Sequence, residues 1–101
     1  MDETIPITYK GKVLAKAKVD ATELFLANMG IEDICDIEGL NQLPDLKILY
    51  LHNNKITRIF GLDHLTGLEE LHLGSNKITK IEGLDRLNFL KRLYMASFTN
   101  E

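Results

Sequence analysis

Two consecutive stretches of the sequence are close copies of each other. Residues 49–70 read LYLHNNKITRIFGLDHLTGLEE and residues 71–92 read LHLGSNKITKIEGLDRLNFLKR, so the offset is 71 − 49 = 22 residues. The shared apolar, asparagine and glycine positions are Leu49/Leu71, Leu51/Leu73, Asn54/Asn76, Ile56/Ile78, Ile59/Ile81, Gly61/Gly83, Leu62/Leu84, Leu65/Leu87 and Leu68/Leu90. A fixed period of about 20 to 29 residues indicates stacked structural units, each of which buries its apolar face on its neighbours.

The pattern continues on both sides of these two copies. An earlier copy begins at Leu24, and it is longer than the others, because Leu49 follows Leu24 by 49 − 24 = 25 residues. The extra residues fall within 34–37, where we expect an added turn. A further strand begins at Leu93, and Phe98 stands where the next asparagine is due (76 + 22 = 98). We predict a single domain over residues 1–101, with an N-terminal segment at 1–22, repeats at 23–48, 49–70 and 71–92, and a partial repeat with a tail at 93–101.

Each position that recurs between the copies has a physical interpretation. The Leu-x-Leu pair alternates with period two, which predicts a short strand with both leucines on one side. Successive strands would stack into a parallel sheet, with the chain returning behind it. Asn54 and Asn76 follow their strands at the corner, where an amide side chain can bond to backbone groups that have left the sheet. Apolar residues at every third position suit a return of three-residue or short helical turns, and Gly61 and Gly83 permit a bend.

The pattern Leu-x-Leu-x-x-Asn-x-Ile-x-x-Ile-x-Gly-Leu-x-x-Leu-x-x-Leu over residues 24–95 resembles the 22-residue leucine-rich repeats of a regulatory subunit of protein phosphatase 1. Similar repeats occur in a dynein light chain and in a spliceosomal protein of the U2 particle. The resemblance implies an α/β fold: a right-handed leucine-rich-repeat solenoid, a short horseshoe with its parallel sheet on the concave face. It implies no particular partner. Met29 stands where the first asparagine belongs, so we expect an incomplete asparagine ladder there.

The two ends of the array differ. Residues 5–19 hold two apolar stretches around a turn at residues 9–12, which predicts a β-hairpin that caps the first repeat. After Met95 only six residues remain in the sequence, too few to cover Leu93 and its neighbours completely. Leu93 and Met95 therefore form an open edge. This edge either joins a second copy or a partner, or the chain is a piece of a longer or stunted array, which is the alternative we favour.

Composition restricts the class of protein. The 101 residues carry a formal net charge of −3, which gives no general attraction to nucleic acid or to an anionic membrane. The one cysteine cannot form an internal disulfide, and no apolar run approaches the roughly 20 residues that span a bilayer. The N-terminus opens with acidic residues instead of the basic start of a signal peptide. We expect an intracellular, cytoplasmic protein that does not contact a membrane.

The residues beside the strand leucines point to a binding surface. One column, between the paired leucines, holds Phe25, Tyr50, His72 and Tyr94, and such aromatic side chains supply much contact area at low entropic cost. Aromatic residues also suit exposed strand positions for structural reasons alone. We predict that the partner-binding residues are Phe25, Ile48, Tyr50, His52, Glu70, His72, Arg92 and Tyr94.

Other candidate sites are weaker. Lys55, Arg58, Lys77 and Lys80 form a basic flank that could meet phosphates, but a solvated flank is the simpler interpretation. His52 and His72 lack an evident third ligand, so we expect no metal site and no cofactor. Cys35 is expected to be a small buried side chain.

The sequence contains no phosphate-binding glycine loop, no HExxH motif and no nucleophile elbow, so we expect no enzyme activity. We predict a protein–protein interaction module, or adaptor, that binds another protein through the concave strand face. Two alternatives remain: a ribonucleoprotein component that uses the basic flank, although we do not favour nucleic acid as a partner, and a building block that self-associates through the open C-terminal edge.

Overall fold

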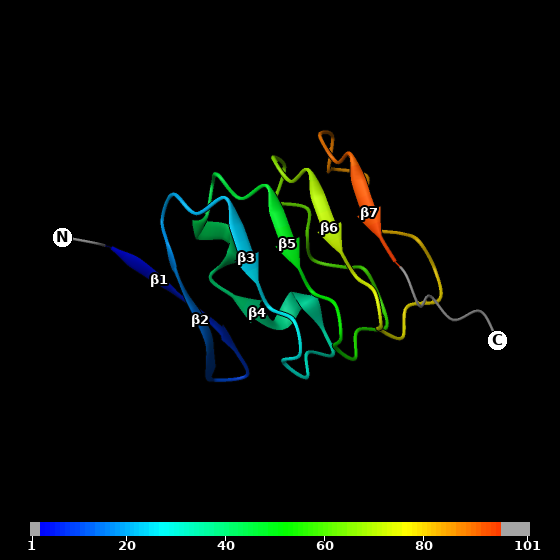
Figure 1. The fold of residues 1–101 in the computed structure, drawn as a ribbon, viewed down its shortest axis with the longest axis horizontal. Coiled ribbons are helices and arrows are strands. Elements are labelled where there is room, and N and C mark those ends of the chain that lie inside the picture. The colour runs from blue at the N-terminus through cyan, green and yellow to red at the C-terminus, as the bar shows by residue number, and fades with distance from the viewer. Residues whose placement is uncertain (1–2, 96–101) are drawn as a thin grey trace.

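The computed structural model describes residues 3–95 (Figure 1). Short strands from successive repeats lie side by side in a parallel sheet of order β3-β5-β6-β7. These strands are β3 (Glu23–Phe25), β5 (Ile48–Tyr50), β6 (Glu70–His72) and β7 (Arg92–Tyr94). Their register aligns Leu24 with Leu49, Leu71 and Leu93 across the sheet. The columns predicted from the repeat offsets are therefore the columns of the sheet.

The core lies behind this sheet. In β3, β5 and β6 the central leucine is buried while the residues on either side are half-buried or exposed, as expected for a strand with one face on the core. The isoleucines and leucines of the return segments complete the core. The fully buried members are Ile7, Leu26, Ile31, Leu43, Leu46, Leu49, Leu51, Ile56, Ile59, Leu62, Leu68 and Leu71.

The three-residue spacing of the return segments corresponds to i→i+3 turns. The backbone N–H of Leu65 donates to the carbonyl of Leu62 at 2.9 Å, and that of Leu68 donates to Leu65 at 3.1 Å. This geometry places every third side chain on the core side. Two short 3-10 helices, η1 (Ile34–Asp36) and η2 (Leu40–Gln42), lie in the first repeat. They are the only helices among residues 3–95, so the return segments in this range contain 3-10 helices and turns but no α-helix.

The prediction that Cys35 is buried is wrong, because its side chain is exposed. It lies in η1, the turn added to the first repeat, between the buried Ile34 and Ile37. A 3-10 helix has three residues per turn, so residues 34 and 37 share the inner face and residue 35 points outward.

The asparagine corner forms as predicted from the repeat. The Asn54 amide oxygen accepts the backbone N–H groups of Met29 at 2.9 Å and Ile31 at 3.0 Å, and its nitrogen donates to the carbonyl of Leu26 at 2.9 Å. Asn76 repeats the arrangement one unit later, accepting the N–H of Ile56 at 3.0 Å. Each asparagine thus bonds to the backbone of the preceding repeat. Met29 supplies no such amide, so the ladder is incomplete at the first corner.

The N-terminal segment is a β-hairpin of β1 (Thr4–Tyr9) and β2 (Lys12–Lys18). Lys10 and Gly11 form its turn with φ of 51° and 83°, and two-residue hairpin turns of the primed kind require such positive values. β1 also pairs with β4 (Ile37–Glu38) of the first repeat in a sheet of order β2-β1-β4. The hydroxyl of the buried Tyr9 accepts the backbone N–H of Glu32 at 2.9 Å. The hairpin is therefore tied to the first repeat through both backbone and side-chain contacts.

Candidate functional site

The open face of the parallel sheet, opposite the core, carries a continuous column of stacked rings. The centroids of Phe25 and Tyr50 are 4.2 Å apart with an interplanar angle of 5°, and those of Tyr50 and His72 are 4.5 Å apart at 23°. His72 and Tyr94 are 4.3 Å apart at 12°. These side chains stack because a parallel sheet places register-paired residues directly beside each other. One ring column, consisting of Phe25, Tyr50, His72 and Tyr94, therefore crosses all strands of the sheet.

The two ends of the ring column are the most accessible. Phe25 is 61% exposed and Tyr94 is 44% exposed, whereas Tyr50 and His72 are half-buried between their neighbours. Of the predicted surface residues, His52 contacts the column edge-on, with its ring centroid 6.1 Å from that of Tyr50. An exposed phenyl ring at one end and an exposed phenol at the other give the surface two apolar contact points.

Charged residues accompany the rings in the neighbouring column. The Arg92 guanidinium donates to the Glu70 carboxylate at 3.1 Å, and the other oxygen of Glu70 lies 3.4 Å from Nε2 of His72. At the other end of the sheet, the Tyr50 hydroxyl donates to Glu23 at 3.4 Å. Ile48 is half-buried between Glu23 and Glu70 in the register. The predicted surface residues thus lie in three adjacent columns, with His52 alone in the third.

The environment of Tyr50 also affects its titration. Partial burial in the ring column raises the pKa of its phenol, and the negative charge and hydrogen bond of Glu23 raise the pKa further. Both effects favour the neutral phenol, because each of them disfavours the phenolate.

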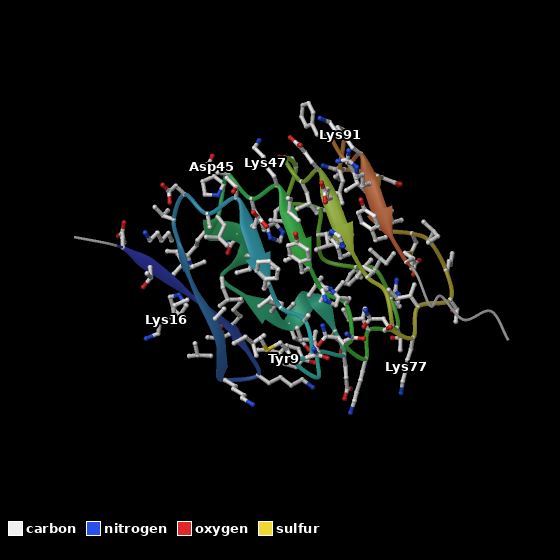
Figure 2. The ribbon with its side chains drawn as sticks, in the orientation of Figure 1. Tyr9, Lys16, Asp45, Lys47, Lys77 and Lys91 are labelled. Carbon is white, nitrogen blue, oxygen red and sulfur yellow. The ribbon has the colours of Figure 1, made fainter. Side chains whose placement is uncertain are left out.

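Sequence reasoning missed a second charged column at the start of the strands. Glu69 lies between two lysines, at 3.6 Å from Lys47 and 3.8 Å from Lys91. Figure 2 shows Lys47 and Lys91 near the N-terminal ends of the strands, and Lys77 on the side of their C-terminal ends. This column could have been found from the repeat offset, because residues 47, 69 and 91 are 22 residues apart and alternate in charge.

The predicted basic flank is partly neutralised. Glu82 pairs with Arg58 at 3.4 Å and with Lys80 at 3.8 Å. Lys55 and Lys77 line a shallow hollow together with the acidic side chains Glu32 and Asp33. The flank is therefore a mixed-charge surface, and the interpretation as a solvated flank agrees with these contacts.

The open C-terminal edge retains partly exposed apolar side chains. Ile81 is 53% exposed, although its equivalent in the preceding repeat, Ile59, is fully buried. Leu93 and Met95 are half-buried at the last strand, and no strand beyond β7 pairs with it among residues 3–95. In repeat 49–70 these positions are covered by the following repeat, 71–92. Among residues 3–95 no further repeat covers repeat 71–92 in the same way.

Residues 3–95 contain neither a metal site nor a membrane-spanning helix. No group of three or more histidine, cysteine or acidic side chains in this range is arranged to hold a metal ion. No helix in the same range is long and apolar enough to cross a membrane.

Comparison with known proteins identifies the family. A model of the family described as "Leucine rich repeat" matches residues 21–78, more than half of the 101-residue chain. The chain belongs to the leucine-rich-repeat family. No curated protein matches the sequence.

Solved leucine-rich-repeat structures are similar to this one. An internalin (InlF) from Listeria monocytogenes is 33% identical with a TM-score of 0.65, and the match covers 87% of this chain and 26% of the internalin. The functional domain of InlJ from Listeria monocytogenes is 26% identical with a TM-score of 0.60, over 83% of this chain and 18% of that one. This leucine-rich-repeat chain therefore spans about a quarter of the first structure and less of the second.

Proposed function

We propose that this leucine-rich-repeat chain is a protein-binding module whose contact surface is the face of the parallel sheet that carries the ring column. The observation that carries the proposal is the unbroken stack of Phe25, Tyr50, His72 and Tyr94, with centroid separations of 4.2, 4.5 and 4.3 Å. Leucine-rich-repeat domains generally mediate protein–protein interactions, and extended faces of solenoids are common binding surfaces.

The stack is suited to binding because it is ordered before a partner arrives. Tyr50 and His72 are each held between two rings, so little side-chain freedom remains to be lost on association. The more exposed Phe25 and Tyr94 would act as anchors in apolar pockets of the partner. Glu70, Arg92 and Ile48 would contribute specificity, because a charged pair at the rim accepts only a complementary partner.

Several features of the architecture belong to the same proposal. We infer that the sheet lines the concave side of a short right-handed horseshoe and that the β1–β2 hairpin caps its first repeat. The hairpin's pairing with β4 and the Tyr9 hydrogen bond support a role in closing that end. We also propose that the module is non-catalytic and acts inside the cell, on the basis of its missing catalytic motifs and its one cysteine.

A second candidate function is assembly through the open C-terminal edge. The exposure of Ile81, set against the complete burial of Ile59, favours a further apolar unit on this side. A second copy or a following repeat would provide it. The ribonucleoprotein alternative is not favoured, because Glu82 pairs with two cations of the basic flank.

Affinity capture from a lysate of the source organism tests the principal proposal. The Tyr50→Ala/His72→Ala variant should lose a protein that the unchanged chain retains, while a matched Lys55→Ala/Lys77→Ala variant on the flank should retain it. Both variants must keep the melting temperature of the unchanged chain within a few degrees. Loss of the partner only with the lysine variant, and a steep dependence on salt, would instead assign binding to the flank.

The assembly candidate has its own measurement. Sedimentation of the unchanged chain at increasing concentration should show a rising mass that Leu93→Lys abolishes. A constant monomeric mass at high concentration would eliminate self-association and leave the ring column as the binding surface.

A further inference from the structure

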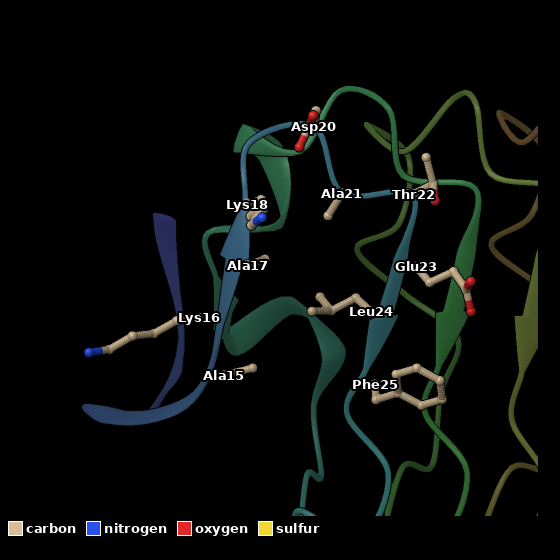
Figure 3. Close-up of a pocket in the computed structure, with 10 residues that line it drawn as sticks. All are labelled: Ala15, Lys16, Ala17, Lys18, Asp20, Ala21, Thr22, Glu23, Leu24 and Phe25. Carbon is tan, nitrogen blue, oxygen red and sulfur yellow. The ribbon is translucent and has the colours of Figure 1, made fainter. Parts of the chain in front are cut away.

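A groove of about 490 Å³ separates the hairpin from the first strand of the parallel sheet. Figure 3 shows β2 on one side and β3 on the other, with the small side chains of Ala15, Ala17 and Ala21 and the side chain of Leu24 between them. The side chain of Lys16 points away from the groove in the same view. The small residues leave room for a polypeptide backbone to approach β3 closely.

Both walls of the groove are free strand edges. β3 pairs only with β5, and β2 pairs only with β1, among residues 3–95. The carbonyl of Thr22 accepts from Ile48, and the N–H of Leu26 donates to Tyr50, so residues 22, 24 and 26 direct their backbone groups toward β5. The backbone groups of the alternate residues, Glu23 and Phe25, therefore point into the groove. A free edge of this kind is a template for an added strand.

The rest of the sheet indicates which side chains an added strand would carry. In the ring column, the rings of every two neighbouring strands stack with their centroids 4.2 to 4.5 Å apart. Where β6 pairs with β7, Arg92 lies opposite Glu70 and donates to it at 3.1 Å. Phe25 and Glu23 occupy the same two columns at the free edge. One face of Phe25 stacks on Tyr50, and the residue as a whole is still 61% exposed.

The charge of the β3 wall complements a cation. Glu23 is exposed, its hydrogen bond within the described residues comes from the Tyr50 hydroxyl, and it forms no ion pair in that part of the chain. Asp20 lines the same groove near the start of β3. Lys18 stands on the opposite wall, so a positive side chain on an occupant would be attracted to the β3 side.

We propose that this groove binds an extended segment of a partner protein as an added strand on β3. The segment carries a lysine or arginine opposite Glu23 and an aromatic residue opposite Phe25, two positions apart. Its backbone bonds to the N–H and carbonyl groups of Glu23 and Phe25. The site is at the edge of the sheet, whereas the proposed protein-binding surface is on its face, and the two share only Phe25 at the end of the ring column.

The chain itself supplies a suitable probe. Residues 91–95, Lys-Arg-Leu-Tyr-Met, contain β7, which places Arg92 and Tyr94 in these same two columns beside β6. We would titrate a synthetic peptide with this sequence, flanked by threonines, into the isotopically labelled protein and follow amide exchange by nuclear magnetic resonance. Binding should slow exchange at the amides of Glu23 and Phe25 and leave the amides of β7 unaffected.

Charge reversal makes the test specific. Glu23→Lys should weaken the peptide roughly five- to ten-fold, because a like charge replaces an opposite one across the strands. A peptide with glutamate in place of arginine should restore binding to that variant. Phe25→Ala should weaken binding roughly three- to ten-fold through the lost ring stacking. Asp45→Lys, an exposed reversal of the same size on a return segment, should change little.

Three results would overturn the proposal. One is no binding at millimolar peptide, and another is equal binding by a peptide whose alternate backbone amides are methylated. The third is slowed exchange at β7 with no effect of Glu23→Lys, which would place the peptide on the C-terminal edge. Tyr50 contacts both Phe25 and Glu23, so a His72→Ala/Tyr94→Ala variant, which leaves both groove residues in place, is added to the capture experiment. This variant should bind the peptide unchanged and lose the captured protein, so failure of the groove and failure of the ring column are distinguishable.

Discussion

Repeats 49–70 and 71–92 have nearly the same apolar residues, yet they do not bury them equally. Ile59 is fully buried in the first of them, whereas Ile81, at the same position in the second, is 53% exposed. Leu62 and Leu68 are likewise buried, while Leu84 and Leu90 are only partly so. The difference lies in the neighbour, because repeat 49–70 has a repeat on each side and repeat 71–92 has one only on its N-terminal side among residues 3–95.

Toward the preceding repeat, however, the two units are alike. Gly61 and Gly83 both have positive φ, and a Cβ at either position would meet the preceding repeat, at Cys35 and at the Ile59 carbonyl respectively. Asn54 and Asn76 both reach back to the preceding backbone. Identical residues therefore contribute differently to stability according to the side on which their contacts lie.

The largest expected effect separates the two isoleucines. Ile59→Ala should lower the free energy of unfolding by about 2–5 kcal/mol, since it leaves a cavity in a fully packed core. Ile81→Ala should cost no more than about 1 kcal/mol, because much of its side chain is already in water. Urea denaturation measures both. Equal losses would mean that Ile81 is covered in solution, which would strengthen the assembly candidate.

The two asparagines should differ less. Asn54→Ala is expected to cost about 2–3 kcal/mol, because it leaves the backbone N–H of Ile31 and the carbonyl of Leu26 without their partner. Asn76 is half-buried, so water can replace part of its bonding, and Asn76→Ala should cost about 1 kcal/mol. Comparing the same denaturation midpoints checks the order, and a larger loss at Asn76 would contradict it.

The two glycines should differ from each other. Gly61→Ala is expected to cost at least about 1–2 kcal/mol from its left-handed backbone. Gly83→Ala should cost more, because its Cβ would also overlap the backbone carbonyl of Ile59. Gly67→Ala is the matched control, because its Cβ would lie 3.9 Å from the nearest atom, the Leu46 carbonyl oxygen, an ordinary contact. Thermal unfolding of the three variants tests this. A neutral Gly83→Ala would show that the last repeat adjusts more freely than the one before it.

These differences mark how far the sequence alone can be interpreted. The offset of 22 predicted the strands, their register and the columns of the sheet, because a repeat forces equivalent residues to the same place. It predicted the ring column for the same reason. It did not predict the exposure of Ile81, since the sequence of a repeat does not say whether a neighbour covers it.

Local conformation was also beyond the repeat pattern. Cys35 lies in the added turn of the first repeat, which has no equivalent in the others, so periodicity could not assign its direction. Glu82 was not recognised as the partner of Arg58, because Phe60 occupies its equivalent position one repeat earlier and hides the pairing from a comparison of copies. The repeat pattern could not assign features that occur once, and the N-terminal hairpin was predicted from its own turn signal instead. Recurrence alone was not sufficient either, because the charged column of Lys47, Glu69 and Lys91 recurs and was missed.

The smallest expected effect concerns the pH dependence of the ring column. The folded-state pKa of Tyr50 is raised, first by partial burial and then by Glu23, so the folded protein favours its neutral phenol more than the unfolded chain does. This contribution to stability is fully present below the ordinary tyrosine pKa of about 10, and it is lost as pH rises through the raised value. Ultraviolet titration should show a late phenolate step that Tyr50→Phe removes and that Glu23→Gln moves to lower pH. If Glu23→Gln leaves the step in place, the raised pKa of Tyr50 comes from burial between Phe25 and His72 and from the nearby Glu70 and Tyr94, without a contribution from Glu23.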